Sequence, residues 1–246
     1  MVRECIKASA SRSSNAALGS WIPVCDVSGS MTGEPMEVAI ALSLLLCESA
    51  PKDSPWHSKM FTFHSSPKMV SVPGVPDYEV EQESMDQTLG SRVNYVRGIE
   101  WGGSTNIEAT LEQVLAQAKK SKLSKKEMAH TAIVIFSDME FDQARGRSNI
   151  PWETAHEALT FKYRDAGFGP APPLVVFWNL RASRSTPVGS KHEKGVVMLS
   201  GFSAGLLKSF LAGNLEEFTP MGQMRAVLDN EQYANLKVID QDCLLE

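Results

Sequence analysis

Long apolar runs are missing from this sequence. No stretch approaches the eighteen or so consecutive apolar residues that a helix needs to cross a bilayer, so we expect no membrane partner. Residues 1–15 are polar and lack the apolar core of a secretory signal. These two absences favour an intracellular, cytoplasmic protein.

Cysteine is scarce and widely spaced. The chain has four cysteines, none of them in a C-x-x-C pair: Cys5, Cys25, Cys47 and Cys243. This spacing argues against a zinc site, because zinc-binding cysteines usually come in closely spaced pairs. Cys25 and Cys47 fall within apolar runs, where we expect them to pack as small buried hydrophobic residues. Reduced thiols agree with an intracellular location.

An excess of basic residues is also missing. The formal net charge of −5 argues against a general nucleic-acid binder, although it leaves room for a local basic patch. Five lysines lie between residues 119 and 126, and a solvated helix end is the simplest interpretation of that stretch. The phosphate-binding motif G-x-x-x-x-G-K-[ST] is absent, and no G-x-G-x-x-G follows an expected strand. The common nucleotide sites are therefore excluded.

The pattern that is present alternates short apolar runs with helical periods, which predicts a doubly wound α/β fold. We expect six strands, at 21–26, 59–63, 68–72, 131–138, 174–180 and 195–199. The second and third should form a hairpin, so that one antiparallel strand lies at the edge of a mostly parallel sheet. Helices are expected on both faces, at 34–48, 87–99 with an interruption at Gly90, 107–119, 152–166, 203–211 and 220–228. The prediction is a preamble over 1–19, followed by a single domain over 20–246.

The first expected strand ends in a series of oxygen donors. Asp26, Ser28 and Ser30 stand at alternate positions of a glycine-containing loop before the next helix. In an open α/β sheet, ligands bind at the carboxyl ends of the strands. Hard oxygen ligands without sulfur or imidazole suit Mg²⁺, Mn²⁺ or Ca²⁺. Taken alone, the same residues could instead form a helix cap and a turn.

Two later stretches place further oxygen donors at element ends. Thr105 follows Gly102, Gly103 and Ser104 directly before a helical pattern, where a capping box with Glu108 explains it equally well. Asp138 ends the apolar run that begins at residue 131. An acid in that position could simply cap the segment that follows it. The three stretches together predict a site on one edge of one sheet.

This combination resembles the metal-ion-dependent adhesion site of the von Willebrand factor A (vWA) domain. By the family pattern, Asp26, Ser28 and Ser30 match the first motif, Thr105 matches the threonine, and Asp138 matches the distal acid. The resemblance implies that the serine pair and the threonine, or the distal acid through water, hold a divalent cation such as Mg²⁺. It implies that Asp26 acts by way of water. Ser104 takes the place of Thr105 if the loop shifts by one residue.

Two enzyme interpretations compete with a binding module. The segment 201–205 matches the nucleophile elbow G-x-S-x-G with Ser203 at its centre. All five histidines precede Ser203, whereas the base histidine follows the serine in α/β-hydrolases, so a helix cap is the plainer interpretation. Glu140 and Asp142 near Asp138 could suggest paired carboxylates, but a two-metal hydrolase needs more acids on the facing strand ends. We therefore expect a protein that is not an enzyme.

The stretches 176–181 and 199–203 are similar to a family of uncharacterised intracellular proteins in which a vWA-like domain follows a helical region. That family is similar to the Ro autoantigen (TROVE) group, in which a helical-repeat ring binds RNA. RNA remains a partner by family analogy alone, because the helical part has no counterpart in these residues. We expect a cation-dependent interaction module, part of a larger intracellular protein, whose partner presents an Asp or Glu to the metal.

Overall fold

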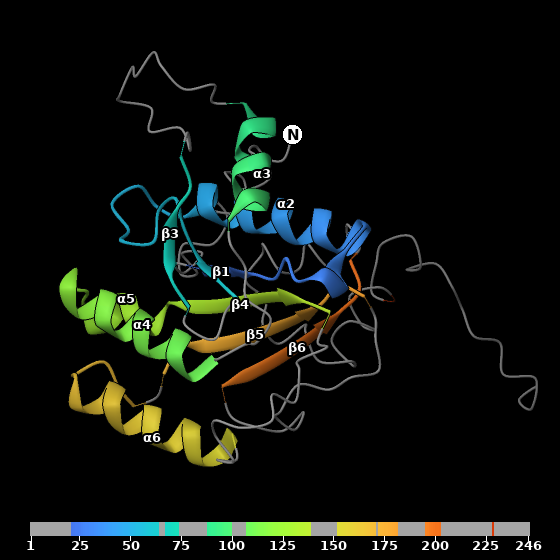
Figure 1. Cartoon of the computed structure of the whole chain (residues 1–246). Helices are drawn as coiled ribbons and strands as arrows, with labels where there is room; N and C mark the ends of the chain where they lie inside the picture. The colour runs from blue at the N-terminus through green and yellow to red at the C-terminus, as the bar shows by residue number, and fades with distance from the viewer. Residues whose placement is uncertain are drawn as a thin grey trace, which may run out of the picture. The chain divides into compact units, whose positions relative to one another are not determined.

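The structure is a computed structural model that describes residues 21–63, 67–73, 88–99, 107–138, 152–170, 172–181, 195–202 and 228 (Figure 1). The chain divides into two units, residues 1–203 and residues 204–246. All strands of the sheet belong to the first unit, and only Leu228 of the second is described. The expected preamble over 1–19 and the expected helices at 203–211 and 220–228 lie outside the described residues, apart from Leu228. The single domain over 20–246 stays a prediction.

Six strands form one sheet in the order β3-β2-β1-β4-β5-β6. Their bounds are β1 Trp21–Cys25, β2 Lys59–Thr62, β3 Met69–Ser71, β4 Ala132–Ser137, β5 Leu174–Asn179 and β6 Val196–Ser200. All neighbours pair in parallel except β2 and β3, which are antiparallel. The predicted fold class is confirmed: a doubly wound, mostly parallel Rossmann-like or vWA-like sheet with one antiparallel edge strand.

The helices cover both faces of this sheet. Their bounds are α2 Glu34–Ser49, α3 Leu89–Gly98, α4 Ile107–Lys120, α5 Lys125–Ala129 and α6 Trp152–Asp165. Helices α2 and α3 lie on one side of the sheet, and α4, α5 and α6 lie on the other (Figure 1). None of the described helices is long and apolar enough to cross a membrane.

The central strands β1 and β4 are apolar except for Ser137 at the end of β4, as expected of strands that helices cover on both sides. Every residue of β1 and β4 is buried. Ile22 and Ile133 pack with Leu111 of α4 and Tyr163 of α6 in the hydrophobic core. Cys25 of β1 and Cys47 of α2 are free and buried, as predicted.

Two helices differ from the expectation. Helix α3 begins at Leu89 after the N-cap Thr88, whose side chain accepts a hydrogen bond from the amide of Ser91. Gly90 therefore lies in the first turn of α3 and does not interrupt it. Helix α5 was not expected, although Ser124 and Glu127 form a capping box at its start.

Candidate metal centre

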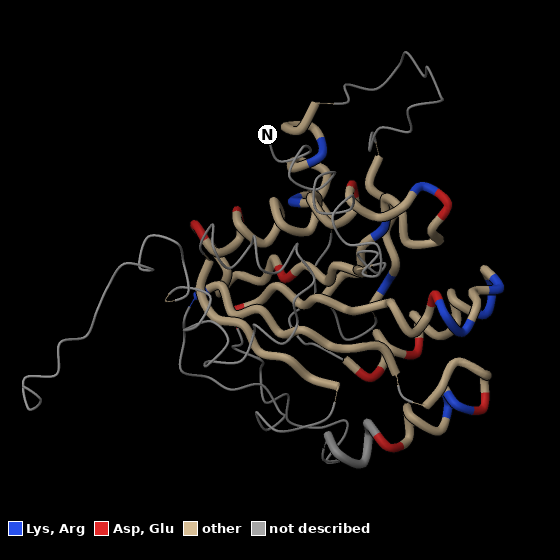
Figure 2. The backbone as a smooth tube through the Cα atoms, turned by 180° about the vertical axis from the view of Figure 1, so that it is seen from behind, with Lys and Arg blue, Asp and Glu red and all other residues tan. Residues whose placement is uncertain are grey.

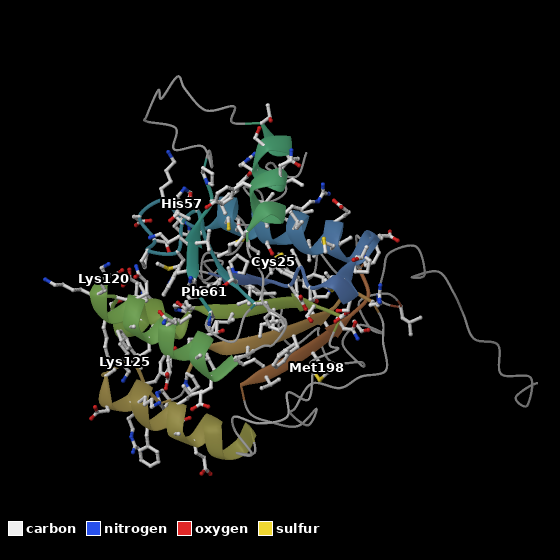
Figure 3. All side chains as sticks on the ribbon, in the orientation of Figure 1. Cys25, His57, Phe61, Lys120, Lys125 and Met198 are labelled. Carbon is white, nitrogen blue, oxygen red and sulfur yellow. The ribbon has the colours of Figure 1, made fainter. Side chains whose placement is uncertain are left out.

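The candidate site lies where the winding of the sheet changes direction. From β1 the chain continues to β2 on one side, and it returns through α4 to place β4 on the other side of β1. Such a switch point leaves a crevice at the carboxyl ends of the two central strands, which is where open α/β sheets bind ligands. Cys25 marks this end of β1 (Figure 3).

The two expected acids follow these two strands. Cys25 pairs with Phe136 in the parallel register, and the amide of Asp26 donates to the Phe136 carbonyl at 3.0 Å. Asp26 is only 4% exposed and Asp138 is fully buried. The structure therefore brings together two predicted site residues that are far apart in the sequence.

The Asp26 carboxylate is held by two donors. Its Oδ1 accepts a hydrogen bond from the amide of Ser28 at 2.9 Å, so the carboxylate closes the turn that follows β1. Its Oδ2 accepts a hydrogen bond from the Ser137 hydroxyl, 2.7 Å away in a buried position. The orientation of the carboxylate is thus fixed by its own loop and by the neighbouring strand.

Ser137 is a site residue that the sequence interpretation missed. It stands opposite Asp26 because Phe136 pairs with Cys25 and each strand continues by one residue. The pattern Ser137-Asp138 contains the hydroxyl, but its role depends on the register between β1 and β4. Since the sequence alone gives no register, the hydrogen bond to Asp26 could not be derived from it.

Ser28 and Ser30 present their hydroxyls side by side. A single 3₁₀ turn, Gly29–Met31, follows Ser28, whose carbonyl accepts from the Met31 amide at 3.0 Å. The turn sets the two serine hydroxyls in a hydrogen bond with each other, with their oxygens 2.9 Å apart in a partly buried position. Neighbouring oxygens of an octahedral Mg²⁺ site, each roughly 2.0–2.1 Å from the ion, lie about 2.9 Å apart as well. The spacing of the hydroxyl pair is therefore compatible with two ligands of one hard cation, which would replace the hydrogen bond between them.

The electrostatics of the site also favour a cation. Burial raises the pKa of Asp26, and the hydrogen bonds from Ser137 and Ser28 lower it only in part. The charge of Asp138 raises the pKa of Asp26 further. A bound cation would offset the repulsion and the lost hydration of both acids.

The remaining expected residues lie outside the described residues. These are Ser104 and Thr105 with their glycine loop, the segment 139–149, and the elbow serine Ser203. Among the residues that the structure describes, no three His, Cys, Asp or Glu side chains cluster as metal ligands. The donors brought together here are of another kind, two hydroxyls with two carboxylates. Such oxygen ligands suit Mg²⁺, Mn²⁺ or Ca²⁺.

Comparison with solved structures supports the class of fold. The crystal structure of the Deinococcus radiodurans RO (RSR) protein is similar to this chain with a TM-score of 0.50. The similarity covers 81% of this chain and 35% of that one, at 17% sequence identity. The expected likeness to the Ro group is thus confirmed for the fold.

Sequence comparison gives the family. The model described as "Domain of unknown function (DUF7788)" matches residues 20–241, and the chain belongs to this family. It is similar to "Uncharacterized protein L728" of Acanthamoeba polyphaga mimivirus, with 38% identity over 228 residues. That alignment covers 91% of this chain and 36% of the viral protein, so the chain spans about a third of the length of this relative.

Proposed function

We propose that this domain is a protein-binding module that depends on a divalent cation, Mg²⁺ or alternatively Mn²⁺ or Ca²⁺. Ser28 and Ser30 would hold the ion directly, together with Thr105 or its neighbour Ser104. Asp26 and Asp138 would contribute directly or through water. The observation that carries the proposal is the pair of serine hydroxyls, 2.9 Å apart beside the hydrogen-bonded carboxylate of Asp26.

The chemistry of this donor set favours binding an acidic group. Hydroxyl ligands are neutral, so the ion keeps much of its positive charge and completes its coordination with water. A carboxylate from a partner can replace one water, and the cation then links the two proteins. An Asp or Glu is therefore the expected contact residue of the partner.

The same donor set supports a binding role better than an enzymatic one. Asp26 and Asp138 are two buried carboxylates that directly follow β1 and β4, and with the serine hydroxyls they would serve one ion. Two-metal hydrolysis uses additional acids to hold a second ion. We propose no catalytic step for this site.

The proposal is tested by capturing partners from a cell extract in excess Mg²⁺ or in excess chelator. A partner that uses the cation should be retained by the wild-type chain in Mg²⁺ and lost with chelator or with Ser28→Ala. Ser121→Ala is the matched control, because it removes an exposed serine hydroxyl at the end of α4. Changing one carboxylate of the captured partner to Lys should abolish retention. Equal capture in chelator and by Ser28→Ala would contradict the proposal.

A further inference from the structure

A compact group of lysines protrudes from the domain at the junction of α4 and α5. We call it the lysine patch: Lys119, Lys120, Lys122, Lys125 and Lys126. Eight of the nine residues from 119 to 127 are exposed, and only Leu123 is half-buried. Figure 2 shows this basic end of the α4 and α5 backbone, and Figure 3 labels Lys120 and Lys125. The patch is thus an exposed, positively charged part of a chain whose formal net charge is −5.

The five ammonium groups have no acidic partners in the described part of the chain. None of them forms an ion pair with a described carboxylate. Other basic residues of this unit do form such pairs: Arg92 with Glu48, Arg97 with Glu37, and Lys162 with Glu112. The charge of the patch is therefore available to an external anion.

Two of these lysines occupy positions where a different residue type would give a more stable fold. Lys122 has a φ of 51°, and it follows α4 in the left-handed conformation that helix ends usually give to glycine. The amide of Leu123 donates to the Ala118 carbonyl at 3.0 Å, which completes this glycine-type helix end. Lys125 is the first residue of α5, beside amides that carry partial positive charge. Fold stability does not account for lysine at these two positions, Lys122 and Lys125.

The lysine patch lies at the opposite edge of the sheet from the candidate metal centre. Helix α5 leads directly into the start of β4 at Ala132, whereas Ser137 at the other end of β4 bonds to Asp26. A six-residue strand spans about 20 Å at roughly 3.3 Å per residue. An anion bound by the patch would leave the metal centre free.

We propose that the lysine patch binds the surface of an anionic lipid bilayer. An exposed set of lysines can meet a plane of phosphate and carboxylate groups, each lysine acting as a point charge. Proteins that track single-stranded nucleic acid use a groove with stacking aromatic residues, and residues 107–135 contain neither an aromatic residue nor an arginine. The observations therefore favour a membrane surface over a nucleic acid.

This inference is independent of the cation-binding proposal. The expectation of no membrane partner was based on the lack of a spanning segment, whereas the lysine patch would bind from one side by charge alone. Bound in this way, the domain would turn the edge that carries Asp26 and Ser28 away from the lipid. A partner could then occupy the metal centre on a membrane-attached domain.

The test is sedimentation of the 246-residue chain with lipid vesicles in the presence of chelator, so that cation binding plays no part. The chain should bind vesicles of phosphatidylcholine with about 30% phosphatidylserine and should not bind pure phosphatidylcholine, and added salt should release it. Lys125→Gln should weaken partitioning about fivefold, and Lys125→Gln with Lys126→Gln roughly 20-fold or more. Lys68→Gln is the matched control, because this exposed lysine at the β2–β3 connection should leave binding unchanged.

A second variant separates binding from folding. Lys122→Gly should raise the melting temperature, because glycine adopts the left-handed backbone conformation without strain. It should still weaken vesicle binding about fivefold, the effect expected from the loss of one lysine. The inference is overturned if the wild-type chain does not bind vesicles that contain phosphatidylserine, or if Lys68→Gln weakens binding as much as Lys125→Gln. It is also overturned if a single-stranded RNA oligonucleotide binds through these lysines while the vesicles do not.

Discussion

At the scale of single residues, Asp26 combines a structural cost with a proposed function. Its carboxylate is buried beside Asp138, and these two features raise its pKa despite the donors Ser137 and Ser28. A buried acid of this kind lowers the stability of the folded protein, and such residues are found at functional sites. Replacing it should therefore have opposite effects on stability and on cation binding.

Asp26→Asn is predicted to stabilise the cation-free protein at neutral pH. A folded-state pKa above the unfolded value means that the folded chain binds this proton more tightly, so stability is lost as the pH rises through the folded-state pKa. The neutral amide avoids that loss, and its advantage should disappear as the pH falls and Asp26 becomes protonated. Thermal unfolding of both proteins in chelator across the acid range measures the difference.

The control is Asp53→Asn, which alters an exposed acid and should change stability by no more than about 0.5 kcal/mol at any pH in that range. A wild-type protein that is more stable than Asp26→Asn at neutral pH in chelator would show that ionised Asp26 is not a cost. The electrostatic description of the site would then be wrong.

At the scale of elements, α2 and α3 are joined by two ion pairs that differ in burial. Arg92 is 8% exposed and pairs with Glu48, whereas Arg97 and Glu37 form their pair in solvent, with side chains 42% and 54% exposed. The two pairs join the same helices, so they provide a matched comparison of buried and exposed charges.

Arg92→Met is predicted to destabilise the fold by about 2 kcal/mol, because it removes the guanidinium partner of the Glu48 carboxylate at a partly buried helix contact. Arg97→Met should cost at most about 1 kcal/mol, since water replaces the lost contact with Glu37. Urea unfolding of the two variants measures both free energies. Equal losses would show that burial of the α2–α3 contact does not set the strength of these pairs.

The elements also show what the sequence can and cannot predict. Strands such as β4 were predicted nearly to the residue, because a β-branched run covered on both faces leaves few alternatives. Helix α5 was missed because five residues are too few to show a helical period, although Ser124 and Glu127 mark its start. Asp26 and Asp138 were predicted from their places at the ends of two apolar runs and from the resemblance to the vWA site. The contact of Asp26 with Ser137 depends on strand register, which the sequence does not specify.

At the scale of the whole sheet-bearing unit, the hydrophobic core and the candidate metal centre are separate. Core residues such as Val24, Ile135 and Phe177 lie between the sheet and α4 or α6, and the centre lies at the strand ends. A weak ion at an edge adds little to such a core: about 2.7 kcal/mol even at a hundred times its dissociation constant. The fold should therefore persist without the ion.

Removing the cation is predicted to leave a cooperative thermal transition, shifted down by only a few degrees. Scanning calorimetry of the chain in excess chelator and in excess Mg²⁺ measures this shift. The comparison should be repeated with Ser28→Ala, whose transition should be the same in both solutions. A chelator that abolishes the cooperative transition of the wild type would mean that the ion is part of the core of the fold.

The central claim is that Asp26 and the two serines form a cation site, and calorimetric titration of chelator-stripped protein with Mg²⁺ and Mn²⁺ tests it most directly. A site with few charged ligands should bind weakly, with a dissociation constant of roughly 10⁻⁴ to 10⁻³ M. Ser28→Ala and Asp26→Ala should lose the binding heat, and Ser121→Ala should keep it. Equal heats from the wild type and Asp26→Ala would contradict the assignment.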